Sequence, residues 1–157
     1  MGSDSDLPVM QATVDVLKGF GISTEVRITS AHRTPDRTHA YVKDADQRGC
    51  AVFIAAAGLA AHLAGTVAAL TLKPVIGVPM DAGPLQGMDA LLSTVQMPGG
   101  IPVACVAIGK AGAKNAGYLA AQIIALQDAE TSGKILAERS KNAAAIASKD
   151  EALQGQN

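Results

Sequence analysis

Three short apolar runs limit what this chain can fold into more than any other feature. Residues 51–57 (Ala-Val-Phe-Ile-Ala-Ala-Ala), 75–78 and 103–108 contain no charged or amide side chain. Apolar runs of this length without alternation are typical of parallel strands that are covered on both faces. Helices must therefore lie on both sides of the sheet, and the sequence predicts an α/β sandwich.

Helical periodicity between these runs supports the same architecture. The spacing of apolar residues predicts helices over residues 7–20, 34–48, 62–72, 85–95 and 113–126. Residues 22–28 instead alternate between apolar and polar side chains, so we expect a half-exposed strand there, near a sheet edge. Strand and helix thus alternate along the chain, as they do in a doubly wound parallel sheet.

Composition narrows the class of protein. With 157 residues, 48% of them hydrophobic, the chain can bury one substantial core, and we expect one main domain. Its net charge is −1, no Lys/Arg-rich run occurs and aromatic residues make up 3%, which argues against a nucleic-acid partner. Apolar stretches are interrupted before they could span a bilayer, so we expect a cytoplasmic protein without a membrane partner. Cys50 and Cys105 are expected to be buried, reduced thiols.

The stretch Ser30-Ala-His-Arg-Thr-Pro35 joins the alternating segment to the next helix. Thr34 is a candidate N-cap, and Pro35 suits the first helical position. His32 and Arg33 should then lie at the carboxyl end of a strand, where α/β sheets bind ligands. A titratable ring beside a fixed cation suggests proton transfer next to an anion, although a solvated surface loop is the alternative.

Two other segments are candidate ligand sites. Gly2-Ser-Asp-Ser-Asp6 precedes a helix, and its backbone N–H groups and hydroxyls could hold a phosphate. Its carboxylates would repel phosphate, so at least one should point elsewhere, toward a ribose hydroxyl or an amine. An ordinary N-cap by Ser5 or Asp6 is the simpler interpretation of this motif alone. His62 follows a run of small residues at a predicted helix start, where it could contact a ligand or cap the helix.

Several familiar motifs are absent from the sequence. The histidines and cysteines show neither CxxC nor HxxxH spacing, so no metal site is predicted. A P-loop, a GxGxxG motif and a Gly-x-Ser-x-Gly nucleophile elbow are also missing.

Six segments in the same order carry a resemblance to a known family. They are residues 1–6 (MGSDSD), 30–35 (SAHRTP), 60–63 (AAHL), 75–79 (VIGVP), 93–98 (STVQMP) and 107–112 (AIGKAG). Together they resemble the N5-carboxyaminoimidazole ribonucleotide mutases, the class I, bacterial-type form of the phosphoribosylaminoimidazole carboxylase catalytic subunit. The resemblance extends from Met1 to about Leu126.

This resemblance implies a flavodoxin-like three-layer α/β/α sandwich with a parallel sheet in the strand order 2-1-3-4-5, assembled into a homo-octamer. The implied activity belongs to de novo purine (IMP) biosynthesis and uses no metal or organic cofactor. A carboxylate moves from the exocyclic nitrogen of the substrate carbamate to carbon 4 of the aminoimidazole ring. Decarboxylation comes first, and the ring carbon then captures the released CO2.

The resemblance also assigns roles to individual residues. His32 matches the acid/base histidine, which protonates the departing nitrogen and later removes the proton from carbon 4. The positions that match substrate-binding residues are Ser3, Asp6 and Arg33, with Arg33 on the 5′-phosphate, and those that match further pocket residues are Ser5, Ser30, Gly58 and His62. Arginine rather than lysine after His32 favours the mutase over the animal-type enzyme that uses CO2 directly.

The sequence departs from the family pattern in three places. Leu59 and Ala64 stand where the family usually has Gly and Pro, so we expect a bulkier loop and a less rigid helix start. The family has a hydrophobic first strand before the Met-Gly-Ser motif, and we expect that this sequence begins after that strand. Residues 128–157 form a generic helical extension after a catalytic domain of residues 1–127, and we expect the extension at a subunit interface.

Two other activities stay open at this point. A CO2-dependent aminoimidazole ribonucleotide carboxylase, a lyase, would share the fold and most of the site. A nonenzymatic nucleotide-binding module could be built on the same sheet. The first would require CO2, whereas the second would bind ligand without turnover.

Overall fold

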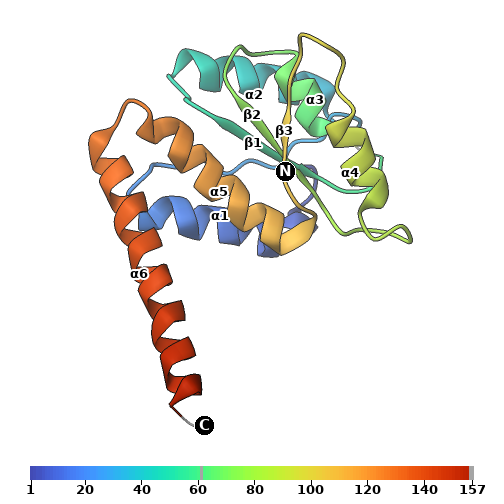
Figure 1. Ribbon diagram of the computed structural model, residues 1–157. Coiled ribbons are helices and arrows are strands. Elements are labelled where there is room, and N and C mark those ends of the chain that lie inside the picture. Colours follow the sequence, from blue (N-terminus) through green and yellow to red (C-terminus); the bar gives the residue numbers. More distant parts are fainter. Residues whose placement is uncertain (61, 156–157) are drawn as a thin grey trace.

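Three parallel strands form the centre of the protein. The structure, a computed structural model, describes residues 1–60 and 62–155. The strands β1 (Phe53–Ala57), β2 (Val75–Pro79) and β3 (Ala104–Cys105) lie in the order β1-β2-β3. Phe53 is opposite Val75, and Gly77 is opposite Cys105. The expected covered parallel sheet is confirmed, and Figure 1 shows helices on both of its sides.

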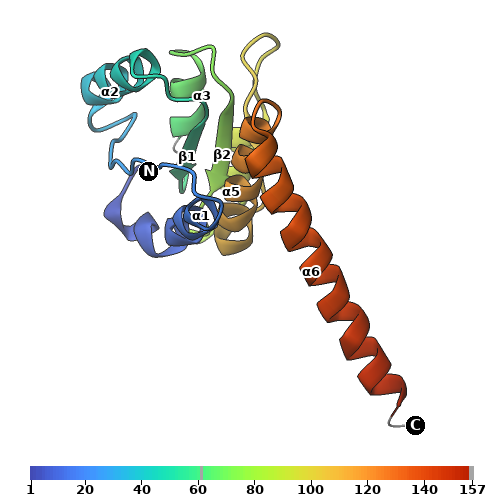
Figure 2. The ribbon, with the colours of Figure 1, turned by 90° about the vertical axis from the view of Figure 1, so that its left-hand side faces the viewer.

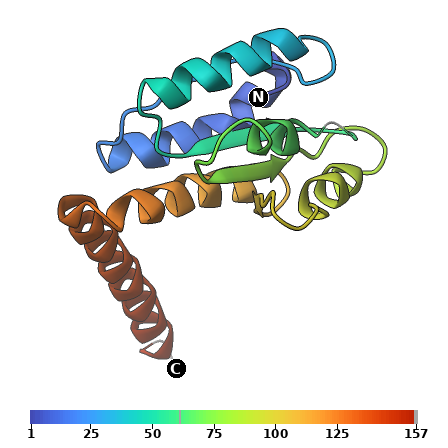
Figure 3. The same cartoon turned by 90° about the horizontal axis from the view of Figure 1, so that it is seen from above.

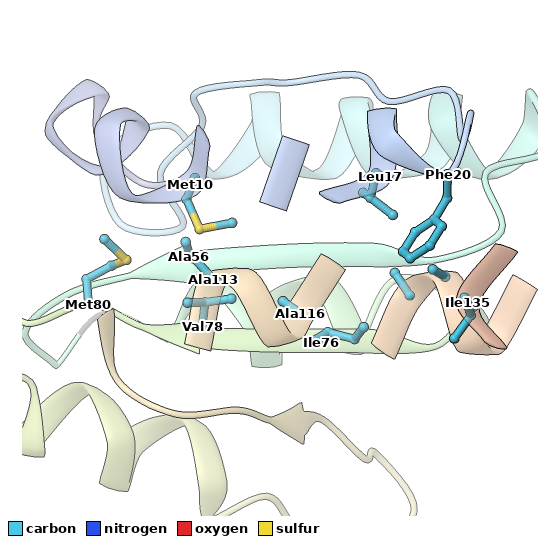
Figure 4. Packing of buried hydrophobic residues seen from close by; sticks show 12 residues of the cluster. Met10, Leu17, Phe20, Ala56, Ile76, Val78, Met80, Ala113, Ala116 and Ile135 are labelled. Carbon is cyan, nitrogen blue, oxygen red and sulfur yellow. The ribbon is translucent and has the colours of Figure 1, made fainter. Parts of the chain in front are cut away.

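One face of the sheet is covered by α1 (Leu7–Gly19) and α5 (Gly109–Ala125). These helices approach closely at Gly117, where a Cβ atom would lie 2.9 Å from Cβ of Val16. The Thr13 hydroxyl donates a hydrogen bond to the Ala113 carbonyl at 2.5 Å, which satisfies a polar group inside this contact. Figure 4 shows side chains of both helices meeting those of β1 and β2 in one apolar cluster.

The opposite face is covered by α2 (Pro35–Gln47), α3 (Leu63–Ala68) and α4 (Met88–Val95). A second apolar cluster joins this layer to the sheet, with Val42 of α2 and Leu63 and Val67 of α3 packed against Phe53 of β1. The chain is therefore an α/β/α sandwich with a separate core on each face of the sheet.

The expectation of a strand over residues 22–28 is wrong as regards pairing. No strand is assigned there, and residues 22–28 do not pair with β1. Instead, the first two residues of the chain lie between the two segments: the Thr29 N–H donates to the Met1 carbonyl at 2.9 Å, and the Gly2 N–H donates to the Ala56 carbonyl at 3.0 Å. A strand needs a neighbour along its length to form a ladder, and this segment meets one only at its end.

The third apolar run, residues 103–108, was expected to be a fully covered strand. Only Ala104 and Cys105 form β3, Ala104 is exposed, and Cys105, like Cys50, is only partly buried. This strand lies at the end of the three-stranded order, so within the described part of the chain one of its sides has no strand beside it. The apolar run marks an edge strand here, not a central one.

The last helix, α6 (Ala129–Gln154), differs from the others. Its first turns pack on the domain: Thr131 and Ile135 are buried, the Lys134 ammonium donates to the Phe20 carbonyl at 3.2 Å, and the Tyr118 hydroxyl donates to Glu138. From Arg139 to Gly155 nearly the whole helix surface is exposed. Figures 2 and 3 show this half projecting away from the sandwich. In the described residues, no helix is long and apolar enough to cross a membrane.

Candidate active site

The candidate site is built on three loops that leave the sheet at neighbouring points. Met1 and Gly2 lie between Thr29 and Ala56, so the loops that follow each of these segments begin side by side. These are the loops that contain Ser3, Ser30 and Gly58. They start at the carboxyl end of β1, which is where an open α/β sheet binds its ligands.

The first loop forms a short 3-10 helix, η1 (Asp4–Asp6), with Ser3 as its N-cap. The Ser3 hydroxyl accepts hydrogen bonds from the Ser5 N–H at 3.3 Å and from the Ser5 hydroxyl at 2.9 Å. Asp6 takes the N-cap position of α1, but its side chain makes no capping hydrogen bond. The simpler interpretation, in which the Asp6 side chain caps the helix, is therefore not what the structure shows.

Asp6 is the most buried residue of the predicted site, with only 7% of its surface exposed. Burial raises the pKa of its carboxyl group, while a hydrogen bond from the backbone of the Ser3 loop and the nearby Met1 ammonium act in the opposite direction. A buried carboxyl group beside two hydroxyls is suited to accept hydrogen bonds from the hydroxyls of a sugar.

The second loop is the Ser30–Pro35 stretch, which makes a turn before α2. The Ser30 hydroxyl accepts from the Arg33 N–H at 3.1 Å. Thr34 precedes α2 as predicted, but its hydroxyl makes no cap bond to the helix: it accepts from the Ser30 N–H at 2.9 Å and donates to the Ser30 carbonyl at 3.2 Å. These bonds fix the turn that presents His32 and Arg33, whose side chains are both exposed.

Arg33 links the first two loops. Its Nη2 atom donates a hydrogen bond to the Gly2 carbonyl at 3.0 Å. The guanidinium group therefore lies against the loop that begins η1, close to Ser3. Because a guanidinium group has five N–H donors in a fixed plane, the bond to Gly2 orients it and leaves donors for a bound anion.

The third loop follows β1 and lies against the loop that follows β2. A Cβ atom on Gly58 would lie 2.8 Å from Cβ of Ala82, so glycine is required for this close approach. The next residue, Leu59, has a φ angle of 57°, a left-handed conformation that favours glycine. The family's usual glycine at this position suits the backbone, and Leu59 adopts the conformation at a steric cost.

His62 lies at the start of α3 but does not cap it through its side chain. Its Nε2 atom is 3.0 Å from Sδ of Met97, and its buried Nδ1 atom has no hydrogen-bond partner among the residues that the structure describes. The ring occupies space that a Cβ atom on Gly65 would fill, because that atom would overlap Nε2. No pattern in the sequence signals the Met97 contact, since it joins two loops that are 35 residues apart.

The geometry thus connects most of the predicted residues. Ser3, Ser5 and Asp6 form one hydrogen-bonded group, Arg33 joins it through Gly2, and Ser30 holds the backbone of Arg33. His32 is next to Arg33 in the same turn, and Gly58 follows the strand that Gly2 contacts. His62 stands apart from this network, since its side-chain contact in the described residues is with Met97. The arrangement offers an anion clamp, hydroxyl and carboxyl groups, and an exposed imidazole.

Comparison with known proteins identifies the family. The model of a family described as AIR carboxylase matches residues 1–145, which is most of the chain. The chain belongs to the AIR carboxylase family. A relative from Synechocystis is 62% identical over 125 residues, which are 80% of this chain and 70% of the relative. Another, from Mycobacterium tuberculosis, is 51% identical over 154 residues, which are 98% of this chain and 87% of that relative. Both are named N5-carboxyaminoimidazole ribonucleotide mutase.

A solved structure of this family confirms the fold. The crystal structure of Treponema denticola PurE superposes with a TM-score of 0.85 and 31% sequence identity, over 96% of this chain and 93% of that one. The flavodoxin-like α/β class expected from the sequence is therefore correct.

Proposed function

We propose that this chain is an N5-carboxyaminoimidazole ribonucleotide mutase, an isomerase of de novo purine biosynthesis. It converts N5-carboxyaminoimidazole ribonucleotide to 4-carboxy-5-aminoimidazole ribonucleotide. The observation that carries the proposal is sequence identity of 51–62%, over 80% or more of this chain, to relatives named for that activity. The linked loops around Arg33 supply a site of matching chemistry.

In this proposal the first two loops hold the ribonucleotide. Arg33 binds the 5′-phosphate as a fork, and its bond to the Gly2 carbonyl holds the guanidinium group against the loop that carries Ser3 and Ser5. Asp6 accepts hydrogen bonds from ribose hydroxyls, which is consistent with its burial beside Ser5. Ser30 acts indirectly, by holding the Arg33 backbone. Gly58 and His62 line the part of the pocket that holds the ring and CO2.

His32 carries the proton transfers. Loss of the carboxylate as CO2 breaks the N–C bond, and the electron pair stays on the exocyclic nitrogen, which takes a proton from the imidazolium. Carbon 4 then attacks the retained CO2 and forms a C–C bond, and the neutral imidazole removes the proton from carbon 4. One histidine can perform both steps because the proton that it gives to the nitrogen is replaced by the proton that it removes from carbon 4. The proposed steps require no metal or organic cofactor.

We also propose a homo-octamer in the cytoplasm. The side chains of Leu85, Met88, Leu92 and Val95, on α4 and the loop before it, are 49–60% exposed. The outer half of α6 adds Ile146 and Leu153, which are 68% and 64% exposed. Apolar surface of this extent is typical of proteins that associate. Light scattering of the purified protein should give eight times the mass of one chain.

The first experiment is a bicarbonate-free assay with N5-carboxyaminoimidazole ribonucleotide that follows formation of the carbon-4 carboxylate. His32→Asn is measured beside the unaltered protein, and His39→Asn, an exposed histidine of α2, serves as the matched control. The proposal expects turnover by the unaltered protein and by the control, with loss of turnover in His32→Asn.

The family's own description favours one second candidate, a carboxylase that acts on aminoimidazole ribonucleotide with CO2. The same assay distinguishes them, because this enzyme would be silent with the carbamate alone and active with aminoimidazole ribonucleotide plus CO2. Ligand binding without turnover under either condition would instead indicate a nonenzymatic nucleotide-binding module.

A further inference from the structure

Two buried threonine hydroxyls flank the loop that carries His32 and Arg33. Oγ1 of Thr29 and Oγ1 of Thr38 are 2.6 Å apart. Thr29 is the residue before Ser30, and Thr38 lies near the start of α2. Only 7% of Thr29 and 0% of Thr38 is exposed. Neither is among the residues proposed to bind the substrate, yet their contact joins the two ends of the loop inside the protein.

The direction of the protons in this contact follows from a second hydrogen bond. The Thr38 hydroxyl also donates to the Thr34 carbonyl at 3.2 Å. A carbonyl oxygen can only accept and a hydroxyl has a single proton, so this bond uses the proton of Thr38. Thr38 must then accept from Thr29. The hydroxyl bonds form a chain that runs from Thr29 through Thr38 to the Thr34 carbonyl.

The far end of this chain lies in the loop itself. The Thr34 N–H donates to the Ser30 carbonyl at 2.9 Å, and the Thr34 hydroxyl bonds to both backbone groups of Ser30. The Ser30 hydroxyl in turn accepts from the Arg33 N–H. The residue that receives the proton of Thr38 thus also fixes the turn. A shift of Thr38 would therefore move the turn and the backbone of Arg33 with it.

The near end of the chain is tied to the sheet. The Thr29 N–H donates to the Met1 carbonyl at 2.9 Å, and the next residue, Gly2, donates to the Ala56 carbonyl of β1 at 3.0 Å. Backbone bonds that reach the sheet thus hold Thr29, and its side chain connects this fixed point to Thr38. The pair therefore sets where α2 begins relative to the sheet.

Packing alone would not require hydroxyls at these positions. Thr38 lies on the buried face of α2 with Val42 and Ala45, which pack in an apolar cluster. Apolar contacts are non-directional, whereas a hydrogen bond weakens steeply when its angle or distance changes. Burying a hydroxyl is also unfavourable unless it is bonded, so the pair favours one position of the helix.

His32 depends on this arrangement more than Arg33 does. The Arg33 guanidinium group has its own bond to the Gly2 carbonyl. In the part of the chain that the structure describes, His32 has no side-chain hydrogen bond, so the backbone of the turn determines where its imidazole lies. Loss of the pair should therefore disturb proton transfer more than phosphate binding.

We propose that Thr29 and Thr38 are positioning residues, whose hydroxyl chain holds the turn so that the His32 imidazole meets the substrate. Neither residue touches the substrate itself. The effect on turnover rests on the proposed function, whereas the effect on the turn does not.

The test removes each hydroxyl and keeps the shape of the side chain. Thr29→Val, Thr38→Val and the double variant lose hydroxyls, and Thr38→Ser keeps one. Thr94→Val is the matched control, because Thr94 is also buried and its hydroxyl also donates to the carbonyl four residues earlier in its helix, that of Ala90, at 2.7 Å. Urea denaturation shows which of the variants are folded.

Two measurements should change together. In each valine variant of the pair, kcat should fall about 10- to 100-fold with little change in KM, as for a misplaced catalytic group. The double variant should be no worse than the single ones, because either substitution breaks the chain. The amide protons of Ser30, Arg33 and Thr34 should exchange about 10-fold faster in the same variants. Thr38→Ser and Thr94→Val should match the unaltered protein in both measurements.

Several outcomes would overturn the proposal. Unchanged kcat in folded Thr38→Val would do so, and so would full kcat in the double variant, since the two hydroxyls would then only satisfy each other. An equal fall of kcat in Thr94→Val would assign the effect to stability, and no recovery in Thr38→Ser would assign it to packing. If a single variant does not fold, the double variant decides, because it leaves neither hydroxyl unpaired.

Failure of the proposed function would look different. In that case the unaltered protein would show no turnover, and amide exchange of the turn would decide the role of the pair. Faster exchange in the valine variants would then support the hydroxyl chain as the support of the turn, and unchanged exchange would overturn it.

Discussion

The Arg33 guanidinium group and the Gly2 carbonyl are joined by a 3.0 Å hydrogen bond, although they are 31 residues apart in the chain. Gly2 in turn donates to Ala56 of β1, so the cation is tied to the sheet through a backbone that cannot rotate freely. A side chain held this way loses less conformational entropy when an anion binds, which favours Arg33 as the anchor for a phosphate.

Replacing Arg33 should therefore weaken substrate binding more than chemistry. In Arg33→Met we expect KM to rise about 10- to 100-fold, as for loss of hydrogen bonds to a charged group. Arg33→Lys should be intermediate, because it keeps the charge but not the fork. Arg37→Met, an exposed arginine of α2, is the control. Steady-state kinetics separate the two effects, and an unchanged KM in Arg33→Met would exclude Arg33 as the phosphate anchor.

The buried Asp6 carboxyl group should make stability depend on pH. Burial raises its pKa above the ordinary 3.8, so between these values the folded state holds a proton that the unfolded state has lost. The contribution of Asp6 to the free energy of unfolding must then fall as pH rises from about 3.8 through the raised pKa. Urea denaturation of the unaltered protein and Asp6→Asn over this range measures the difference. The free energy of unfolding of the unaltered protein minus that of Asp6→Asn should fall as pH rises. A rise in that difference would contradict the assignment.

The sequence was most informative where both faces of an element are covered. Residues 51–57 and 75–78 were expected to be strands, and β1 and β2 lie within two residues of those bounds. Burial on both faces imposes a continuous apolar pattern that has few other interpretations. The helix predicted from Ala113 in fact begins at Gly109. Gly112 lies inside this helix and is a packing position, because a Cβ atom there would overlap the Ala107 carbonyl oxygen.

Pairing and loop contacts were beyond sequence reasoning. The alternation of residues 22–28 describes which side chains face a core, but a ladder also requires a neighbour, which the pattern cannot specify. The sequence did indicate which loops carry Ser3, Arg33 and His62, but it did not indicate their contacts. The bond from Arg33 to Gly2 and the contact of His62 with Met97 depend on how distant segments meet.

Leu59 should tolerate glycine and reject β-branched residues. Its φ angle of 57° costs a non-glycine residue about 1–2 kcal/mol, and a β-branched side chain costs more. Leu59→Gly should be as stable as the unaltered protein or more so, although it loses the contact of the Leu59 side chain with Gly83. Leu59→Val should be the least stable of the three. Chemical denaturation gives the order, and equal stability of the Val and Leu forms would contradict the left-handed conformation.

A methyl group at Gly65 should displace the His62 ring. The added Cβ atom would overlap Nε2, so the imidazole must leave its place beside Met97. If His62 lines the pocket, Gly65→Ala should lower kcat about 10- to 100-fold with the fold intact. Gly19→Ala, at the end of α1 with open space around its Cβ position, is the matched control and should retain full activity. Full activity of Gly65→Ala would remove His62 from the site.

Two truncations should separate the packed and the projecting parts of α6. A chain that ends at Asp128 loses Ile135, which is buried against the α1–α5 layer, and should be destabilised by about 2–4 kcal/mol. Among the described residues, a chain that ends at Ser140 loses only exposed ones, and its free energy of unfolding should lie within about 0.5 kcal/mol of that of the full chain. It also loses the exposed Ile146 and Leu153, so we expect weaker assembly, measured as a lower mass by light scattering on dilution. If the chain that ends at Ser140 has the same number of subunits as the full-length protein at every concentration, the projecting half of α6 has no part in the subunit interface.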